Sequence, residues 1–124
     1  DVALSVSKER WGPATPEQAL LWWEKRIVHA HNSLAQVPQN SKLELRLEDL
    51  VVHQREESYT SLLALLQLED HPTMRSYFEE QMLPEKMHSG EWQKQVSNPE
   101  AFGSTYQKIV KRLRKDGIFI EKFY

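Results

Sequence analysis

The spacing of apolar residues along the chain predicts a mainly helical protein. The clearest signal covers residues 16–35, where apolar side chains recur every three or four positions, the period of one helix face. These positions are Leu20, Trp23, Ile27, Ala30 or His31, and Leu34. The segment Thr15-Pro16-Glu17-Gln18 adds a capping box, with a hydroxyl at the N-cap, proline at N1 and glutamine at N3.

Four further segments have helical spacing. Residues 1–10 predict a short helix that ends at Trp11-Gly12-Pro13, and residues 56–68 predict a longer one. A short helix is expected from Pro72, and the last helix from Asn98-Pro99. Gly117 follows the last apolar position of that helix, as a C′ glycine does. Residues 84–97 read as a loop.

One segment has the period of a strand. Residues 43–48 alternate leucine with a charged residue, so that one face of the strand is apolar. A single strand is not stable without partners, and the chain offers few, of which residues 118–120 are one. We therefore expect one or two short strands, with the rest of their sheet encoded elsewhere.

Length and composition fit one globular domain. The chain has 124 residues, of which 40% are hydrophobic and 27% charged. No apolar run reaches the roughly 20 residues that a membrane span needs, and no signal peptide is visible. The chain has no cysteine, which excludes disulfides and thiolate chemistry and fits the reducing cytoplasm.

The charge is unevenly distributed along the chain. Residues 1–100 hold 10 Lys/Arg and 16 Asp/Glu, whereas residues 101–124 hold 6 and 2. The basic C-terminal segment is typical of the solvated face of an amphipathic helix. Residues 108–115 could alternatively bind anionic polymers or lipid head groups. The isoelectric point near 6.2 argues against nucleic acid as a partner.

Few residues have the spacing of a catalytic or metal site. His29 and His31 lie about 200° apart on a helix and cannot share one metal ion. The remaining candidates are two segments that could bind an anion. One is the start of the first helix, with the hydroxyl of Ser5. The other is the segment 86–92, whose lysine, hydroxyl, glycine and indole suit a phosphate-binding turn; its candidates are Lys86, Ser89, Gly90 and Trp92. Both segments could equally be ordinary surface.

Together, five segments resemble the C-terminal portion of the sulfotransferases that use 3′-phosphoadenosine 5′-phosphosulfate. Residues 1–5 resemble the end of the family motif Arg-x-Pro-Arg-Asp-x-x-x-Ser, and residues 45–51 resemble the strand that ends in Tyr-Glu-Asp-Leu. Residues 56–68 are similar to the following helix. Residues 88–92 look like the late Gly-x-Trp loop, and Gly117-Ile118 like the closing Leu-Gly-Tyr.

The resemblance implies the fold, the co-substrate and the site. Residues 1–124 would be a single C-terminal segment of a P-loop-type α/β sulfotransferase with a parallel sheet. The nucleotide sulfate donor would be its co-substrate, and no metal is implied. Its nucleotide contacts would be Ser5, Lys86, Ser89, Gly90 and Trp92. The family's 5′-phosphosulfate loop and catalytic base have no counterpart in these residues, so the chain by itself is expected to be inactive.

Two functions follow. In the first, the chain belongs to an enzyme that transfers a sulfuryl group to a hydroxyl or amine, on a small molecule or a glycan. In the second, it is a non-catalytic helical module that binds a protein or associates with itself. Apolar side chains left without a sheet favour self-association. Its candidate surfaces are Trp22, Trp23 and the face of Leu43, Leu45 and Leu47.

Overall fold

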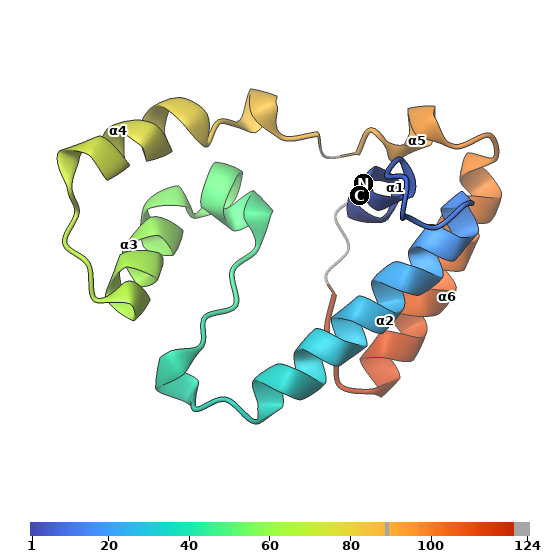
Figure 1. Cartoon of the computed structure of the whole chain (residues 1–124), viewed down its shortest axis with the longest axis horizontal. Coiled ribbons are helices and arrows are strands. Elements are labelled where there is room, and N and C mark those ends of the chain that lie inside the picture. The colour runs from blue at the N-terminus through green and yellow to red at the C-terminus, as the bar shows by residue number, and fades with distance from the viewer. Residues whose placement is uncertain (89, 121–124) are drawn as a thin grey trace. The chain divides into compact units, whose positions relative to one another are not determined.

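The computed structural model describes residues 1–88 and 90–120, and divides the chain into two compact units. Unit 1 comprises Asp1–Ala35 and Ser89–Tyr124, and unit 2 comprises Gln36–His88. Figure 1 shows the helices of each unit. The units differ in charge: unit 1 holds 11 Lys/Arg and 8 Asp/Glu, whereas unit 2 holds 5 and 10.

The predicted helices of unit 1 are confirmed. They are α1 (Val2–Ser7), α2 (Pro16–Ala35) and α6 (Pro99–Lys115). The predicted capping box fixes the start of α2. The Gln18 amide donates to Thr15 Oγ1 at 3.2 Å, and the Gln18 side chain accepts a hydrogen bond from Ala14 N. Asn98 caps α6, and Gly117 follows it with a φ of +78°. Residues 84–97, read as a loop, contain two short helical turns, η3 (Pro84–Lys86) and α5 (Trp92–Gln95).

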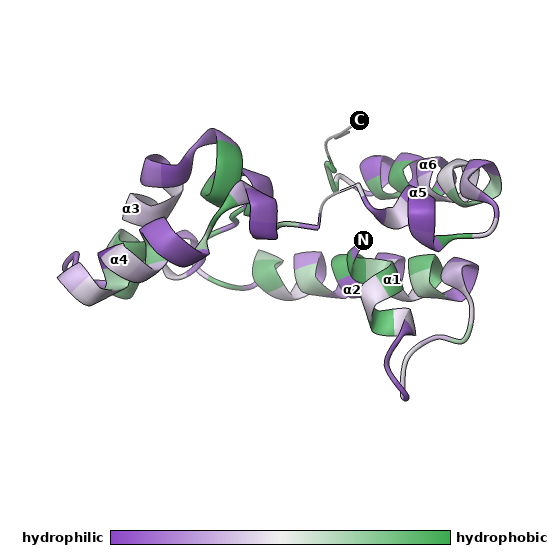
Figure 2. Ribbon diagram, turned by 90° about the horizontal axis from the view of Figure 1, so that it is seen from above, coloured by the Kyte–Doolittle hydropathy of each residue, from purple (hydrophilic) through white to green (hydrophobic). Residues whose placement is uncertain are grey.

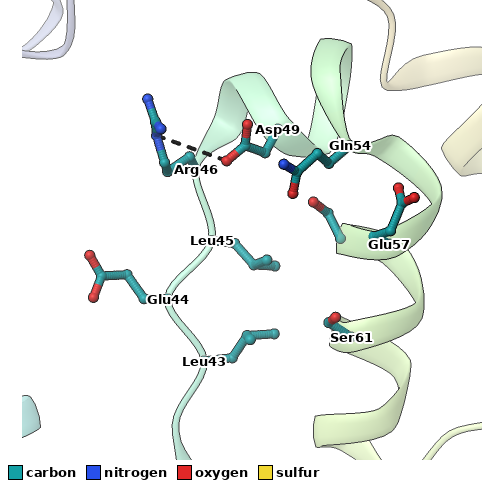
Figure 3. Close-up of a pocket in the computed structure, with 9 residues that line it drawn as sticks. Leu43, Glu44, Leu45, Arg46, Asp49, Gln54, Glu57 and Ser61 are labelled. Carbon is teal, nitrogen blue, oxygen red and sulfur yellow. Dashed lines mark ion pairs between the residues drawn. The ribbon is translucent and has the colours of Figure 1, made fainter. Parts of the chain in front are cut away.

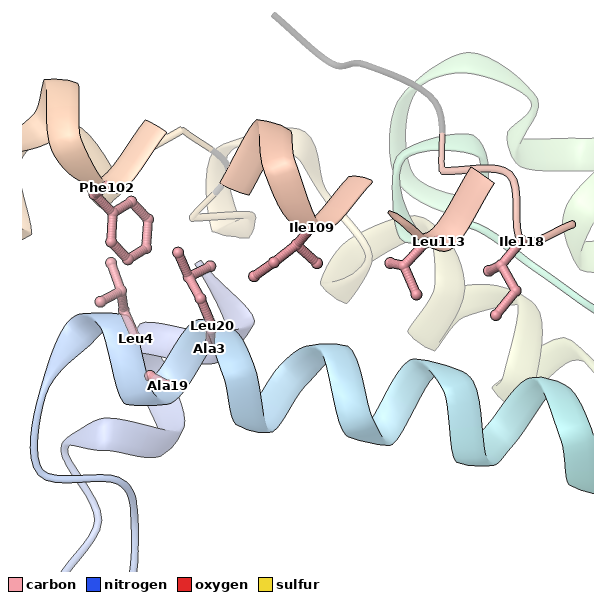
Figure 4. Close-up of a cluster of buried hydrophobic side chains, with 8 residues drawn as sticks. All are labelled: Ala3, Leu4, Ala19, Leu20, Phe102, Ile109, Leu113 and Ile118. Atoms are coloured by element: carbon pink, nitrogen blue, oxygen red, sulfur yellow. The ribbon is translucent and has the colours of Figure 1, made fainter. Parts of the chain in front are cut away.

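The core of unit 1 lies between α2 and α6, with α1 packed beside α2 (Figures 1 and 4). Ile109 and Leu113 of α6 point toward α2 and expose 0% and 1% of their surface. Ala3 and Ala19 are small and buried, which lets α1 approach α2 closely. Hydrophilic and hydrophobic residues are mixed along α2 and α6 in Figure 2, as expected of helices with one buried face. Arg112 adds a two-pronged ion pair to Glu24 at 2.7 and 2.8 Å.

Unit 2 is built from shorter elements. They are η1 (Gln39–Ser41), the π-helical turn η2 (Asp49–His53), α3 (Arg55–Leu66) and α4 (Pro72–Gln81), followed by η3. α3 and α4 match the helices predicted at 56–68 and from Pro72. The side chain of Arg55 ties the C-terminal end of α4 to η2 by donating to the carbonyls of Met82 and Val51. Its apolar cluster is small and consists of Tyr59, Leu63 and Phe78, with Leu50 and Met82 beside them.

The predicted strands are wrong for the part of the chain that the structure describes, in which no strand occurs. Residues 42–46 are extended, but no second strand pairs with them, and a ladder of hydrogen bonds is what defines a sheet. The alternation of residues 43–48 serves another purpose: Leu43 and Leu45 pack toward α3 (Figure 3). Ile118 is buried in the core of unit 1 instead of pairing as a strand.

The core of unit 1 gives a first testable prediction. Ile109→Ala should lower the free energy of unfolding by about 2–5 kcal/mol, because it removes a fully buried side chain and leaves a cavity. All four tryptophans lie in unit 1, so urea unfolding followed by tryptophan fluorescence reports on this unit. Lys108→Ala, one residue earlier on the exposed face, is the matched control and should change stability by less than about 0.5 kcal/mol. Equal stabilities of the two variants would contradict this account of the core.

Candidate functional site

The residues expected to bind a nucleotide are divided between the two units. Ser5, Gly90 and Trp92 belong to unit 1, and Lys86 belongs to unit 2. Ser89 lies outside the described residues. The structure therefore tests the arrangement of the unit 1 candidates with one another.

Within unit 1, one hydrogen bond joins the two segments that carry Ser5 and Gly90. The Gly90 amide donates to Oδ2 of Asp1 at 2.7 Å, across 89 positions of sequence. The Ser5 amide donates to the Asp1 carbonyl at 2.9 Å, so the exposed Ser5 side chain lies one helical turn beyond the residue that binds Gly90. The start of α1 and the Gly90 loop therefore form one surface.

The conformation of the loop depends on glycine at position 90. Gly90 has a φ of +81°, a value that side chains with a Cβ adopt at a cost of about 1–2 kcal/mol. A Cβ placed there would meet no atom within 4 Å. Glycine is therefore required here by the backbone conformation and not by lack of space.

Trp92 has a structural role in this surface. Its ring centroid lies 5.5 Å from that of Phe102, in the tilted arrangement that favours aromatic contacts. A Cβ at Gly103 would lie 3.6 Å from the indole, an ordinary contact distance, so the ring lies against α6 at this glycine. The indole fixes the Gly90 loop to the core, and it is a packing residue in this structure.

Lys86 has local partners in unit 2. Its Nζ donates to Oε1 of Gln81 at 2.6 Å and to the carbonyl of Glu80 at 3.2 Å. A lysine near the last carbonyls of a helix is favoured by the helix dipole. In this structure the ammonium group thus stabilises the C-terminal end of α4.

Unit 2 contains a network of charged residues that the sequence did not predict. Arg75 donates to Oδ2 of Asp70 at 2.6 and 2.9 Å and to the carboxylate of Glu56 at 2.8 and 2.9 Å. Tyr59 donates its hydroxyl to the other Asp70 oxygen at 2.9 Å, and its ring stacks on Phe78 at 4.4 Å. The guanidinium of Arg75 lies 4.5 Å from the centre of the Tyr59 ring. No short spacing marks these residues, because Arg75 and Glu56 are 19 positions apart.

The network shifts the pKa values of its members. Hydrogen bonding to Arg75 lowers the pKa of Asp70 below its usual value, and the bond from Tyr59 adds to that effect. Burial, followed by the bond to Asp70, raises the pKa of Tyr59. Bonds to Asp70 and Glu56 raise the pKa of Arg75, which stays charged. The side chains of this network are all hydrogen-bonded to one another, so the arrangement stabilises the contact of α3 with α4.

A hollow of about 360 Å³ lies between residues 43–46 and α3 (Figure 3). Leu43 and Leu45 form an apolar wall, and Asp49 and Glu57 bring carboxylates to the rim. Nε of Arg46 lies 3.9 Å from Oδ2 of Asp49 and partly compensates the rim charge. The hollow thus combines an apolar wall with a charged rim beside an extended backbone.

Residues 1–88 and 90–120 contain neither a metal-binding cluster nor a membrane-spanning helix. No group of three or more metal-binding side chains is present there. No helix in the same residues is both long and apolar enough to cross a membrane. Comparison of the chain with protein-family models, with curated proteins and with solved structures gave no match.

The first prediction from these sites concerns the link between α1 and the loop. Asp1→Ala should speed hydrogen exchange of the Gly90 amide about tenfold or more, because a bond to a charged acceptor contributes about 1.5–3 kcal/mol. The measurement is amide exchange by NMR, with Glu9→Ala as a control for the loss of one acidic side chain. An unchanged Gly90 rate in Asp1→Ala would show that the bond does not hold the loop in solution.

The second prediction concerns pH. Because the folded-state pKa of Asp70 lies below the ordinary value of 3.8, the carboxylate stabilises unit 2 fully above that pH. The stabilisation is lost as the pH falls through the lower, folded-state pKa. In thermal unfolding followed by circular dichroism, the midpoint temperature should therefore decrease when the pH is lowered below 3.8. It should decrease less in Asp70→Asn.

The neutral variant Asp70→Asn should also have a lower midpoint at pH 7, where Asp70 is charged and bound to Arg75. Glu69→Gln, an exposed neighbour, is the control and should keep the wild-type profile. A wild-type profile in Asp70→Asn would mean that the network does not stabilise unit 2.

Proposed function

We propose that residues 1–124 are the C-terminal portion of a sulfotransferase that uses 3′-phosphoadenosine 5′-phosphosulfate and acts on a hydroxyl or amine acceptor, and that the protein is cytoplasmic. The proposal rests on the order of the five segments that resemble this family. The observation that carries it furthest is the 2.7 Å bond from the Gly90 amide to Asp1, because it joins the two unit 1 segments in which the resemblance puts nucleotide contacts.

The chemistry of this surface suits a supporting role in binding a phosphate. The exposed hydroxyl of Ser5 is able to donate to a phosphate oxygen, and Asp1, which binds the Gly90 amide, lies one helical turn away from Ser5. The carboxylate of Asp1 is negative and repels a phosphate, so cations from another part of the protein must accompany Ser5. In this proposal Ser5 and the loop position the nucleotide, while Trp92 holds the loop on the core.

The proposal assigns no catalytic residue to this chain. Sulfuryl transfer requires a base for the acceptor and positive groups at the leaving phosphate. Neither role is given to any of residues 1–124, and both would fall to other parts of the enzyme. Lys86 stays a weaker candidate contact, since its ammonium group already has two partners at the end of α4.

The test compares the 124-residue chain with the full-length gene product that carries it. The chain alone should give no turnover of the sulfate donor, and little or no heat in calorimetry with adenosine 3′,5′-bisphosphate. In the full-length protein, Ser5→Ala should weaken binding of that bisphosphate about 10- to 100-fold, the effect of losing one hydrogen bond to a charged group.

Ser104→Ala provides the matched control, because Ser104 is an exposed serine on α6 away from the Gly90 loop in sequence. It should bind the bisphosphate as the wild type does. Turnover by the isolated chain, or equal affinities of the two serine variants, would overturn the proposed role of this surface.

A further inference from the structure

One side of α6 carries a group of exposed positive charges. Residues 101–115 contain five Lys/Arg and no Asp/Glu. Arg112 forms an ion pair with Glu24 of α2. The other four cations have no acidic partner within residues 1–88 and 90–120. These four residues, which we call the basic face of α6, are Lys108, Lys111, Arg114 and Lys115.

The basic face lies opposite the buried side of α6. Successive residues of an α-helix are about 100° apart, so the four cations fall within about 120° of the circumference. The middle of this arc is opposite Ile109 and Leu113, which point toward α2 (Figure 4). Asp116, the next residue along the chain, falls outside the arc. All four side chains are exposed, so the basic face is directed away from the core of unit 1.

The helix dipole accounts for only part of this charge. A cation in the last turn of a helix is favoured by the partial negative charge at that end, and the effect falls off within one turn. Arg114 and Lys115 lie in the last turn, and Arg114 also donates to the carbonyl of Ile120 at 3.2 Å. Lys108 and Lys111 precede that turn. Their charge is therefore free to attract an anionic partner.

We propose that the basic face of α6 docks on a membrane surface that contains acidic phospholipids. A cluster of four or more Lys/Arg on a helix is attracted by anionic head groups, and each cation near the surface strengthens binding about fivefold. The partner is thus defined by charge complementarity along one rigid helix.

An exposed aromatic residue favours a lipid surface over a soluble polyanion. Phe119 follows α6 and exposes 79% of its surface, whereas its neighbour Ile118 is buried in the core. A phenyl ring gains apolar contact at the boundary between head groups and acyl chains. A nucleic acid or an acidic polymer offers the charge without that apolar layer, and the isoelectric point near 6.2 also argues against nucleic acid.

Docking of this kind leaves the core of unit 1 intact. The apolar side chains of α6 are buried against α2, so the helix lies on the membrane through its charged side and does not insert its apolar side. Charge therefore supplies most of the attraction. Binding should be reversible and should weaken as salt is added, because the Debye length falls from about 10 Å at 0.1 M to about 3 Å at 1 M.

Co-sedimentation of the 124-residue chain with lipid vesicles tests the inference. The vesicles consist of phosphatidylcholine alone, or of phosphatidylcholine with about 30% phosphatidylserine to supply the negative surface potential. The chain should sediment with the phosphatidylserine vesicles at about 0.1 M salt and dissociate from them at about 1 M salt. It should not sediment with phosphatidylcholine alone.

Charge removal tests which residues make the contact. The triple variant Lys108→Gln with Lys111→Gln and Lys115→Gln should weaken binding to the phosphatidylserine vesicles about 30- to 100-fold. Phe119→Ala should weaken it about fivefold or more, because the ring loses its apolar contact. All four side chains are exposed, so the fold should be retained, and circular dichroism checks that it is.

A second triple variant is the matched control. Lys8→Gln with Lys25→Gln and Lys94→Gln makes the same change in net charge at exposed lysines of unit 1 outside α6. It should bind the phosphatidylserine vesicles within about threefold of the wild type, since the attraction is strongest for charges at the surface and falls off within a Debye length.

Four outcomes would overturn the inference. They are equal binding of the two triple variants, equal binding to the two kinds of vesicle, wild-type binding by Phe119→Ala, or tighter binding to soluble polyphosphate than to vesicles of the same total negative charge. The last outcome would assign the basic face to a soluble polyanion. The result is independent of the proposed enzyme activity, because none of these variants changes Ser5, Gly90 or Trp92.

Discussion

Burial of one face of α6 against α2 is the interaction on which the order of unit 1 depends. Ile109 and Leu113 are the largest side chains with under 2% exposure in the described chain, and both lie on that face. Once α6 is held there, Phe102 at its start provides the surface on which Trp92 rests. The Gly90 loop follows from that contact, and the start of α1 reaches the loop through Asp1. The candidate surface is therefore a consequence of core packing several residues away.

Unit 2 is stabilised in a different way. Its buried cluster holds only a few side chains, so apolar burial alone offers little free energy. The network of Tyr59, Asp70 and Arg75 adds hydrogen bonds and a stacked guanidinium to the contact of α3 with α4. Several apolar residues stay exposed in this unit, among them Leu47, Leu66 and Tyr77. With a small core and exposed leucines, unit 2 buries less apolar surface than unit 1 and depends more on these polar contacts.

The candidate site was partly predictable from sequence. The residue types of Ser5 and Gly90 predict anion contacts, and the structure brings their segments together. Trp92 is expected near the nucleotide as the indole that packs the turn, and the structure shows which residues it packs against, Phe102 and Gly103. Lys86 is predicted to supply positive charge to an anion, and the structure gives its ammonium group two local partners, Gln81 and the carbonyl of Glu80. The sequence could not reveal these partners of Trp92 and Lys86, because each contact depends on how the chain folds between the two residues.

What the sequence by itself determined is the local structure. The 3–4 residue spacing, the Thr15 box, the prolines at helix starts and Gly117 each act within a few residues, so they set the helices and their ends. Only the tertiary structure decided the rest: the division into two units, the network around Arg75, and the fate of residues 43–47. Alternation of leucine and charge specifies an extended backbone with one apolar face. Whether that face meets a strand or a helix depends on the surroundings, and here α3 covers the leucines while the backbone of residues 43–45 stays open.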